Sequence, residues 1–112
     1  MAITLVNTVT LMGALGQHGT AVAIADQALS YFAGNDISDE TECVSTTLAN
    51  KGLALGHLGR HQEAIAVYDE LLARFEGSDS PAVQTAIQLA LDGRAEAIEA
   101  MTQKKKKAKK RR

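Results

Sequence analysis

Three histidines and one cysteine are the side chains of this sequence best suited to metal binding or acid–base catalysis. His57 and His61 are four residues apart, a spacing that places two ligands on one face of a continuous helix. Gly59 lies between them in a predicted turn, so we expect no shared face and no zinc site. His18 and Cys43 complete no catalytic set with their neighbours, and one cysteine cannot form an internal disulfide. We therefore predict no catalytic residue, no metal and no cofactor.

An internal repeat with a period of 43 residues contains two of these histidines at equivalent positions, His18 and His61. Over residues 4–36 against 47–79, 14 of 33 positions are identical without a gap, whereas chance would give roughly two. Such a period is typical of stacked supersecondary units. A residue that recurs at one position of each unit is more simply explained as scaffold than as a site. The best-matched segments are LGQHGTAVAIADQALSYF (Leu15–Phe32) and LGRHQEAIAVYDELLARF (Leu58–Phe75).

Each copy has the pattern of an amphipathic helix that follows a tight turn. The apolar spacing i, i+1, i+4, i+7, i+8, i+11 places one stripe on a helical face. Gly16 and Gly59 lie in the predicted turns, and Gly34 and Gly77 follow the two helices, where a left-handed cap favours glycine. Gly52 lies on the apolar face of another helix, and we expect it to let two helices approach closely. The apolar positions of the second copy are Ala64, Ile65, Tyr68, Leu71, Leu72 and Phe75.

The first residues allow two interpretations. Residues 3–5 and 8–11 alternate like a β-strand, but they fall in the register of the helix that contains Leu48, and repeat equivalence outweighs local propensity. Asp79-Ser80-Pro81 is typical of a helix start, with Ser80 as the cap and Pro81 at the first helical position. The sequence therefore predicts an all-α fold with helices at about 2–14, 17–33, 39–57, 60–76 and 81–102.

The composition agrees with an all-α domain that spans no membrane. Apolar residues make up 46% of the chain, and there is one proline. No apolar run approaches the roughly 20 residues that cross a bilayer. The apolar N-terminal stretch has no preceding basic residue, so we expect a core helix there and no signal peptide. We expect a cytoplasmic location, which the single cysteine suits.

Charge is divided sharply along the sequence. Residues 1–103 contain four basic and 13 acidic residues, a net charge of −9, whereas 104–112 carry +8. We predict a folded domain over 1–103 and a disordered basic tail over 104–112. The tail could act as a solvated extension, lie against the acidic body, or bind nucleic-acid phosphates or anionic lipid without specificity. Its basic residues are Lys104, Lys105, Lys106, Lys107, Lys109, Lys110, Arg111 and Arg112.

Residues 48–75 resemble a tetratricopeptide (TPR) repeat of the longer bacterial form, and the resemblance extends over about 3–101. Leu48, His61 and Glu76 depart from the pattern, because Trp, Tyr and Pro are common at those positions. The first copy is more degenerate, with Ala25 in place of Tyr68. The matching residues are Leu48, Gly52, Leu55, Gly59, Ala64, Tyr68 and Leu72.

The resemblance implies an α-solenoid of two helical hairpins plus one additional C-terminal helix, in units of about 3–36, 37–79 and 80–102. It also implies a non-catalytic scaffold that binds a peptide or partner protein on the concave face of the first helix of each unit. Asn7 and Asn50 match asparagines that hold a C-terminal carboxylate in chaperone-binding members. Those members also need basic groove residues, which are missing here, so a basic or apolar peptide is favoured. Alternatively, both asparagines cap and pack locally. The expected partner-binding residues are Asn7, Thr10, Thr46, Asn50, Leu53, His57, Asp92 and Glu96.

The two ends of the predicted array differ. About three units are usually needed to bury a continuous core, and this chain has two and a half. The first predicted helix has no charged residue. Either the chain is a piece of a longer array, or its apolar N-terminal end stacks on another copy of itself.

Overall fold

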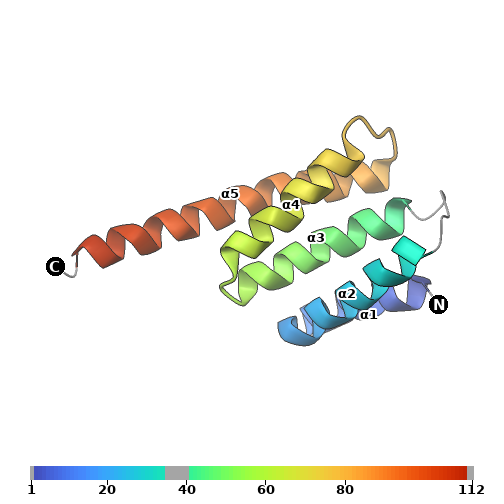
Figure 1. The fold of residues 1–112 in the computed structure, drawn as a ribbon, viewed down its shortest axis with the longest axis horizontal. Coiled ribbons are helices and arrows are strands. Elements are labelled where there is room, and N and C mark those ends of the chain that lie inside the picture. The colour runs from blue at the N-terminus through green and yellow to red at the C-terminus, as the bar shows by residue number, and fades with distance from the viewer. Residues whose placement is uncertain (1, 35–40, 111–112) are drawn as a thin grey trace.

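Five α-helices make up the described part of the chain in the computed structural model, which covers the backbone of residues 2–34 and 41–110 (Figure 1). Side chains are described for 8–31 and 42–103. The all-α prediction is confirmed, and α1 replaces the strand alternative at the N-terminus. Within the described ranges no helix is both long and apolar enough to cross a membrane. The helices are α1 (Ala2–Ala14), α2 (His18–Gly34), α3 (Thr41–His57), α4 (His61–Phe75) and α5 (Pro81–Lys110).

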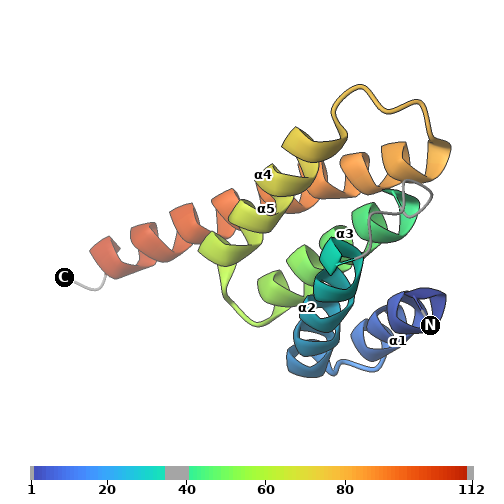
Figure 2. The same ribbon diagram turned by 45° about the vertical axis from the view of Figure 1, so that its right-hand side comes forward.

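The helices form two hairpins, α1–α2 and α3–α4, and α5 follows the second hairpin (Figure 1, Figure 2). Each helix packs against the next one in the chain. The odd-numbered helices also pack side by side, α1 against α3 and α3 against α5. This second set of contacts joins one hairpin to the next and gives the odd-numbered helices a shared surface.

The turns inside the two hairpins have the same geometry, as the repeat predicts. Gly16 and Gly59 both have a φ of 79°, a left-handed conformation that costs glycine least. The N–H of Gln17 donates to the Met12 carbonyl at 2.8 Å, and the N–H of Arg60 donates to the Leu55 carbonyl at 2.9 Å. This bond spans five residues and closes the end of a helix in the manner of a Schellman motif. The same backbone turn is therefore used twice, 43 residues apart.

The core follows the predicted stripe of α4 and the facing side of α3. Tyr68 is 2% exposed and Leu71 is fully buried, and Leu48 of α3 is 1% exposed. A Cβ at Gly52 of α3, or at Gly93 of α5, would lie closer than 3 Å to Tyr68 atoms. The close approach expected at Gly52 is thus confirmed, and the Tyr68 ring occupies the space that both glycines leave.

The start of α5 agrees with the prediction and its end does not. Ser80 caps the helix, since its Oγ accepts a long hydrogen bond from the Val83 N–H at 3.5 Å. The backbone of α5 continues to Lys110, whereas the sequence predicted an end near residue 102 and a disordered segment from 104. Lysine, alanine and arginine are good helix formers, and cations near a helix C-terminus are stabilised by the helix dipole. The side chains of 104–112 lie outside the described residues.

Candidate binding groove on the odd-numbered helices

Leu53 of α3 is shared by three hollows on the surface of the odd-numbered helices. One of about 170 Å³ lies towards α1, one of about 240 Å³ lies between α3, α4 and α5, and one of about 500 Å³ lies over α3 and α5. Leu53 is partly exposed at their meeting point. We call these three neighbouring hollows, which share Leu53 in their lining, the groove.

The α1 end of the groove is mainly apolar and carries the polar side chains of Thr10 and Asn50. Asn50 Nδ2 donates a hydrogen bond to Thr10 Oγ1 at 3.0 Å, which joins α3 to α1 across the hollow. Val9 and Ala54 form the buried floor beside them. The bond agrees with the alternative that Asn50 packs locally, because one of its two amide N–H groups already has a protein partner.

Two histidine rings stack at the centre of the groove. The ring centroids of His18 and His57 are 4.3 Å apart and their planes differ by 12°. His57 and His61 border the same hollow, together with Glu96. The Nδ1 atoms of His18 and His61 are buried, and no hydrogen-bond partner is found for them among the described residues. Stacked rings do not direct their nitrogens to one point, and no His/Cys/Asp/Glu group of three or more in the described ranges is placed to hold a metal ion.

The α5 end of the groove is acidic. Asp92 and Glu96 are both exposed along the largest hollow. Gln88 Nε2 donates to Asp92 Oδ1 at 3.1 Å, which orients one carboxylate without neutralising it. Leu89 and Leu53 supply the apolar surface beneath these charges. The α5 end therefore combines an apolar floor with a negative rim.

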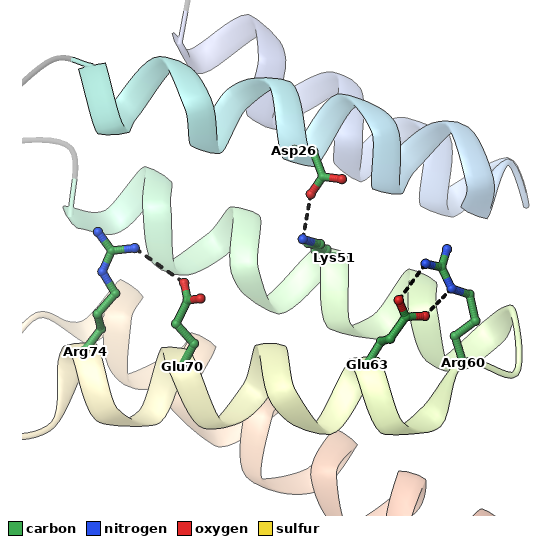
Figure 3. A network of polar contacts seen from close by, with 6 residues as sticks. All are labelled: Asp26, Lys51, Arg60, Glu63, Glu70 and Arg74. Carbon is green, nitrogen blue, oxygen red and sulfur yellow. Dashed lines mark hydrogen bonds and ion pairs between the residues drawn. The ribbon is translucent and has the colours of Figure 1, made fainter.

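The positive charges of the described side chains are engaged outside the groove. Lys51 contacts Asp26 at 2.6 Å, and Arg74 contacts Glu70 at 3.5 Å (Figure 3). Arg94 donates from Nε to Asp69 at 2.7 Å. None of these residues lines the three hollows.

The fourth pair, Arg60 with Glu63, is held by two hydrogen bonds (Figure 3). The hydrogen bond from Arg60 lowers the pKa of Glu63, and the same bond raises the pKa of Arg60. Each lysine and arginine between residues 8 and 103 is thus paired with an acid, and none of them balances Asp92 or Glu96 in the described structure.

The structure gathers most of the sequence-predicted residues around the groove. Thr46 is partly buried and lines none of the three hollows, and the Asn7 side chain lies outside the described residues. The residues that line the hollows are Thr10, Asn50, Leu53, His57, Asp92 and Glu96.

His18 and His61 also border the groove and were assigned to the scaffold by sequence reasoning. Their recurrence one residue pair after each turn glycine was visible in the sequence. That position directly follows the turn, so it faces the end of the preceding odd-numbered helix. This location relative to the turn was the signal that could have placed both histidines at the groove.

Comparison with models of known protein families, with curated protein sequences and with solved structures finds no match.

Proposed function

We propose that the groove binds an extended basic or apolar segment of a partner protein and that the chain acts as a non-catalytic, TPR-like scaffold. The observation that supports this most directly is that apolar Leu53 lines the same hollows as Asp92 and Glu96, whose negative charges no described lysine or arginine neutralises. An apolar floor contributes affinity through burial, and a negative rim selects against acidic ligands. The resemblance of residues 48–75 to a TPR unit points to the same surface.

The expected ligand follows from the charge along the groove. A lysine or arginine near Asp92 or Glu96 would gain charge-assisted hydrogen bonds, whereas a carboxylate would meet like charge. At the α1 end, Asn50 and Thr10 already bond to each other. A ligand there competes with an existing hydrogen bond, so we expect the α5 end to contribute most of the discrimination between basic and acidic peptides.

The test uses three fluorescent ten-residue peptides in which leucine alternates with lysine, serine or glutamate. Anisotropy titrations should rank their affinities in that order. Leu53→Arg should weaken the lysine peptide by about tenfold, which corresponds to about 1.4 kcal/mol. The paired change Asp92→Asn with Glu96→Gln should weaken the lysine peptide and leave the serine peptide unchanged.

The matched control is Gln62→Arg, which adds the same charge at an exposed position of α4 away from the hollows. It should leave all three affinities unchanged. Equal binding of the glutamate peptide, or a loss with Gln62→Arg as large as with Leu53→Arg, would contradict the proposal.

A second candidate function is salt-dependent binding of a polyanion, nucleic acid or anionic membrane surface, through residues 104–112. The continuous helical backbone of α5 to Lys110, which projects beyond the other helices in Figure 1, favours it. Binding of a short DNA duplex should then weaken by orders of magnitude between about 50 and 200 mM salt. Deletion of 104–112 should abolish it, and Leu53→Arg should not change it.

A further inference from the structure

An uncharged, exposed stripe runs along the outer side of α5; Gln84 in it donates to the Ser78 carbonyl at 3.3 Å, and Gln88 also borders the groove. Its members are spaced four and three residues apart in alternation, which keeps them on one line of a helix and is the spacing of a coiled-coil seam. All are exposed, with Leu91 at 48% and Ile98 at 41%. We call this the outer stripe, and it consists of Gln84, Gln88, Leu91, Ala95, Ile98 and Thr102.

The repeat shows what such a surface is built to contact. Leu91, Ala95 and Ile98 are equivalent to Leu48, Gly52 and Leu55 of α3, 43 residues earlier. On α3 these positions are covered by α4, and Leu48 and Leu55 are only 1% and 2% exposed. The outer stripe is therefore the counterpart of a helix-packing surface that is buried elsewhere in the same molecule.

We propose that a second copy of this chain covers the outer stripe, with the two α5 helices packed antiparallel in a symmetric dimer. Leu91 of one copy would then lie opposite Ala95 of the other, and Gln88 opposite Ile98. The small Ala95 side chain allows the two helix axes to approach closely. A symmetric pair of this kind closes on itself and is the commonest form of oligomer.

Charge complementarity favours the antiparallel direction. In this alignment Lys104 and Lys105 of one copy lie opposite Ala82 and Pro81 at the start of the other α5, and the rest of the basic segment continues past the α4–α5 loop of that copy. Glu76 and Asp79 are exposed there, and Glu42 lies beside them because it accepts a hydrogen bond from Ser80 Oγ at 2.9 Å. A parallel pair would instead bring two basic segments together.

The shape of α5 supports the same occupant. The C-terminal part of this 30-residue helix projects beyond α3 and α4 in Figure 1 and Figure 2. A helix that projects alone into water gains little from its own hydrogen bonds. The Thr102 hydroxyl donates to the Ile98 carbonyl at 2.9 Å, so it is satisfied within its own helix and can face an apolar partner.

The first experiment is sedimentation equilibrium of the full chain. A dimer of twice the 11.9 kDa chain mass is expected, and Leu91→Asp with Ile98→Asp should raise its dissociation constant at least about a hundredfold. Both side chains are exposed in the monomer, so circular dichroism should show unchanged helix content. Leu11→Asp, at a 54% exposed position of α1, is the matched control and should leave the dimer intact.

The second experiment fixes the direction of packing, in a Cys43→Ala background with a short thiol-reactive cross-linker. Gln84→Cys mixed with Thr102→Cys should give a heterodimer, whereas each variant alone should give little product. Asp92 of both copies approaches the symmetry axis, so Asp92→Asn should tighten the dimer while it weakens the basic peptide in the groove. The experiments can thus disprove the dimer without disproving the proposed peptide binding, and they can disprove peptide binding without disproving the dimer.

Four outcomes would overturn the dimer. The first is that the chain remains a monomer at millimolar concentration. The second is that Leu11→Asp dissociates the assembly and the changes at Leu91 and Ile98 do not. The third is that Gln84→Cys alone cross-links as well as the mixture, which would indicate parallel packing. The fourth is that the mass grows steadily with concentration, which would indicate head-to-tail stacking through α1.

Discussion

The ring of Tyr68 on α4 lies against Gly93 on α5 so closely that a Cβ at Gly93 would be 2.5 Å from the tyrosine hydroxyl oxygen. The same ring covers Gly52 of α3. One aromatic side chain thus sets the distance between three helices, and two glycines make room for it. Because Glu96 is one turn from Gly93, this packing also positions the acidic end of the groove.

A methyl group at Gly93 should therefore destabilise the fold. Gly93→Ala forces a buried ring to move, and overpacking of this kind typically costs about 1–3 kcal/mol, partly offset by the better helix propensity of alanine. Chemical denaturation in urea measures the difference. Gly56→Ala is the control, since nothing lies within 4 Å of its Cβ, and it should stabilise by up to about 1 kcal/mol. Equal stability of the two variants would contradict the packing.

The stability of the fold should fall at alkaline pH because of Tyr68. Burial, with a smaller contribution from Glu96, raises the pKa of Tyr68 to about 12, whereas an unfolded tyrosine titrates near about 10. The folded state therefore holds the proton more tightly. The contribution is fully present below pH 10 and is lost as the pH rises towards 12, by about 2–3 kcal/mol in all.

Unfolding free energies at pH 9 and pH 11.5, with tyrosine absorbance as the titration signal, measure this loss. In Tyr68→Phe the alkaline decline should be smaller by about the same amount. If Tyr68→Phe and the original chain lose stability in parallel, the assignment to Tyr68 is wrong.

The two hairpin turns should respond alike to the same substitution. Gly16→Ala and Gly59→Ala each force a side chain into the left-handed region, at a cost of about 1–2 kcal/mol, and both turns have the same backbone hydrogen bonds. Asparagine tolerates this conformation better than alanine, so Gly59→Asn should recover part of the loss. Differential scanning calorimetry would show the shifts, and a neutral result at either glycine would mean that the turn relaxes.

The ion pair between Arg94 and Asp69 should contribute little to stability. The two side chains are 41% and 53% exposed, and exposed pairs are typically worth at most about 1 kcal/mol. A double-mutant cycle of Arg94→Met and Asp69→Asn should give a coupling energy of about 0.5 kcal/mol that vanishes in molar salt. A coupling above about 2 kcal/mol would show that this pair orients α5 on α4.

Sequence reasoning located the helices because the 43-residue repeat adds information to weak local propensities. Sequence and structure differ at the end of α5, where the sequence predicts a helix end near residue 102 and the backbone is helical to Lys110; lysine and alanine suit a helix. The partner-binding residues expected on α3 and α5 came from the resemblance to a TPR repeat, and their role stays a prediction. The contacts between units, such as the His18–His57 stack and the Asn50–Thr10 bond, did not follow from register, because they depend on how far each helix is rotated and shifted against the next.

The Tyr68–Gly93 pair has its counterpart one unit earlier, where the equivalent residues are Ala25 and Asn50. In the Tyr68–Gly93 pair the larger side chain is on the even-numbered helix α4. In the Ala25–Asn50 pair the larger side chain is on the odd-numbered helix α3. The two copies of the hairpin therefore differ at this position and cannot be interchanged without cost. If the two hairpins were exchanged along the chain, a tyrosine would face an asparagine at one helix contact, which would be overpacked. At the other contact an alanine would face a glycine, which would leave a cavity.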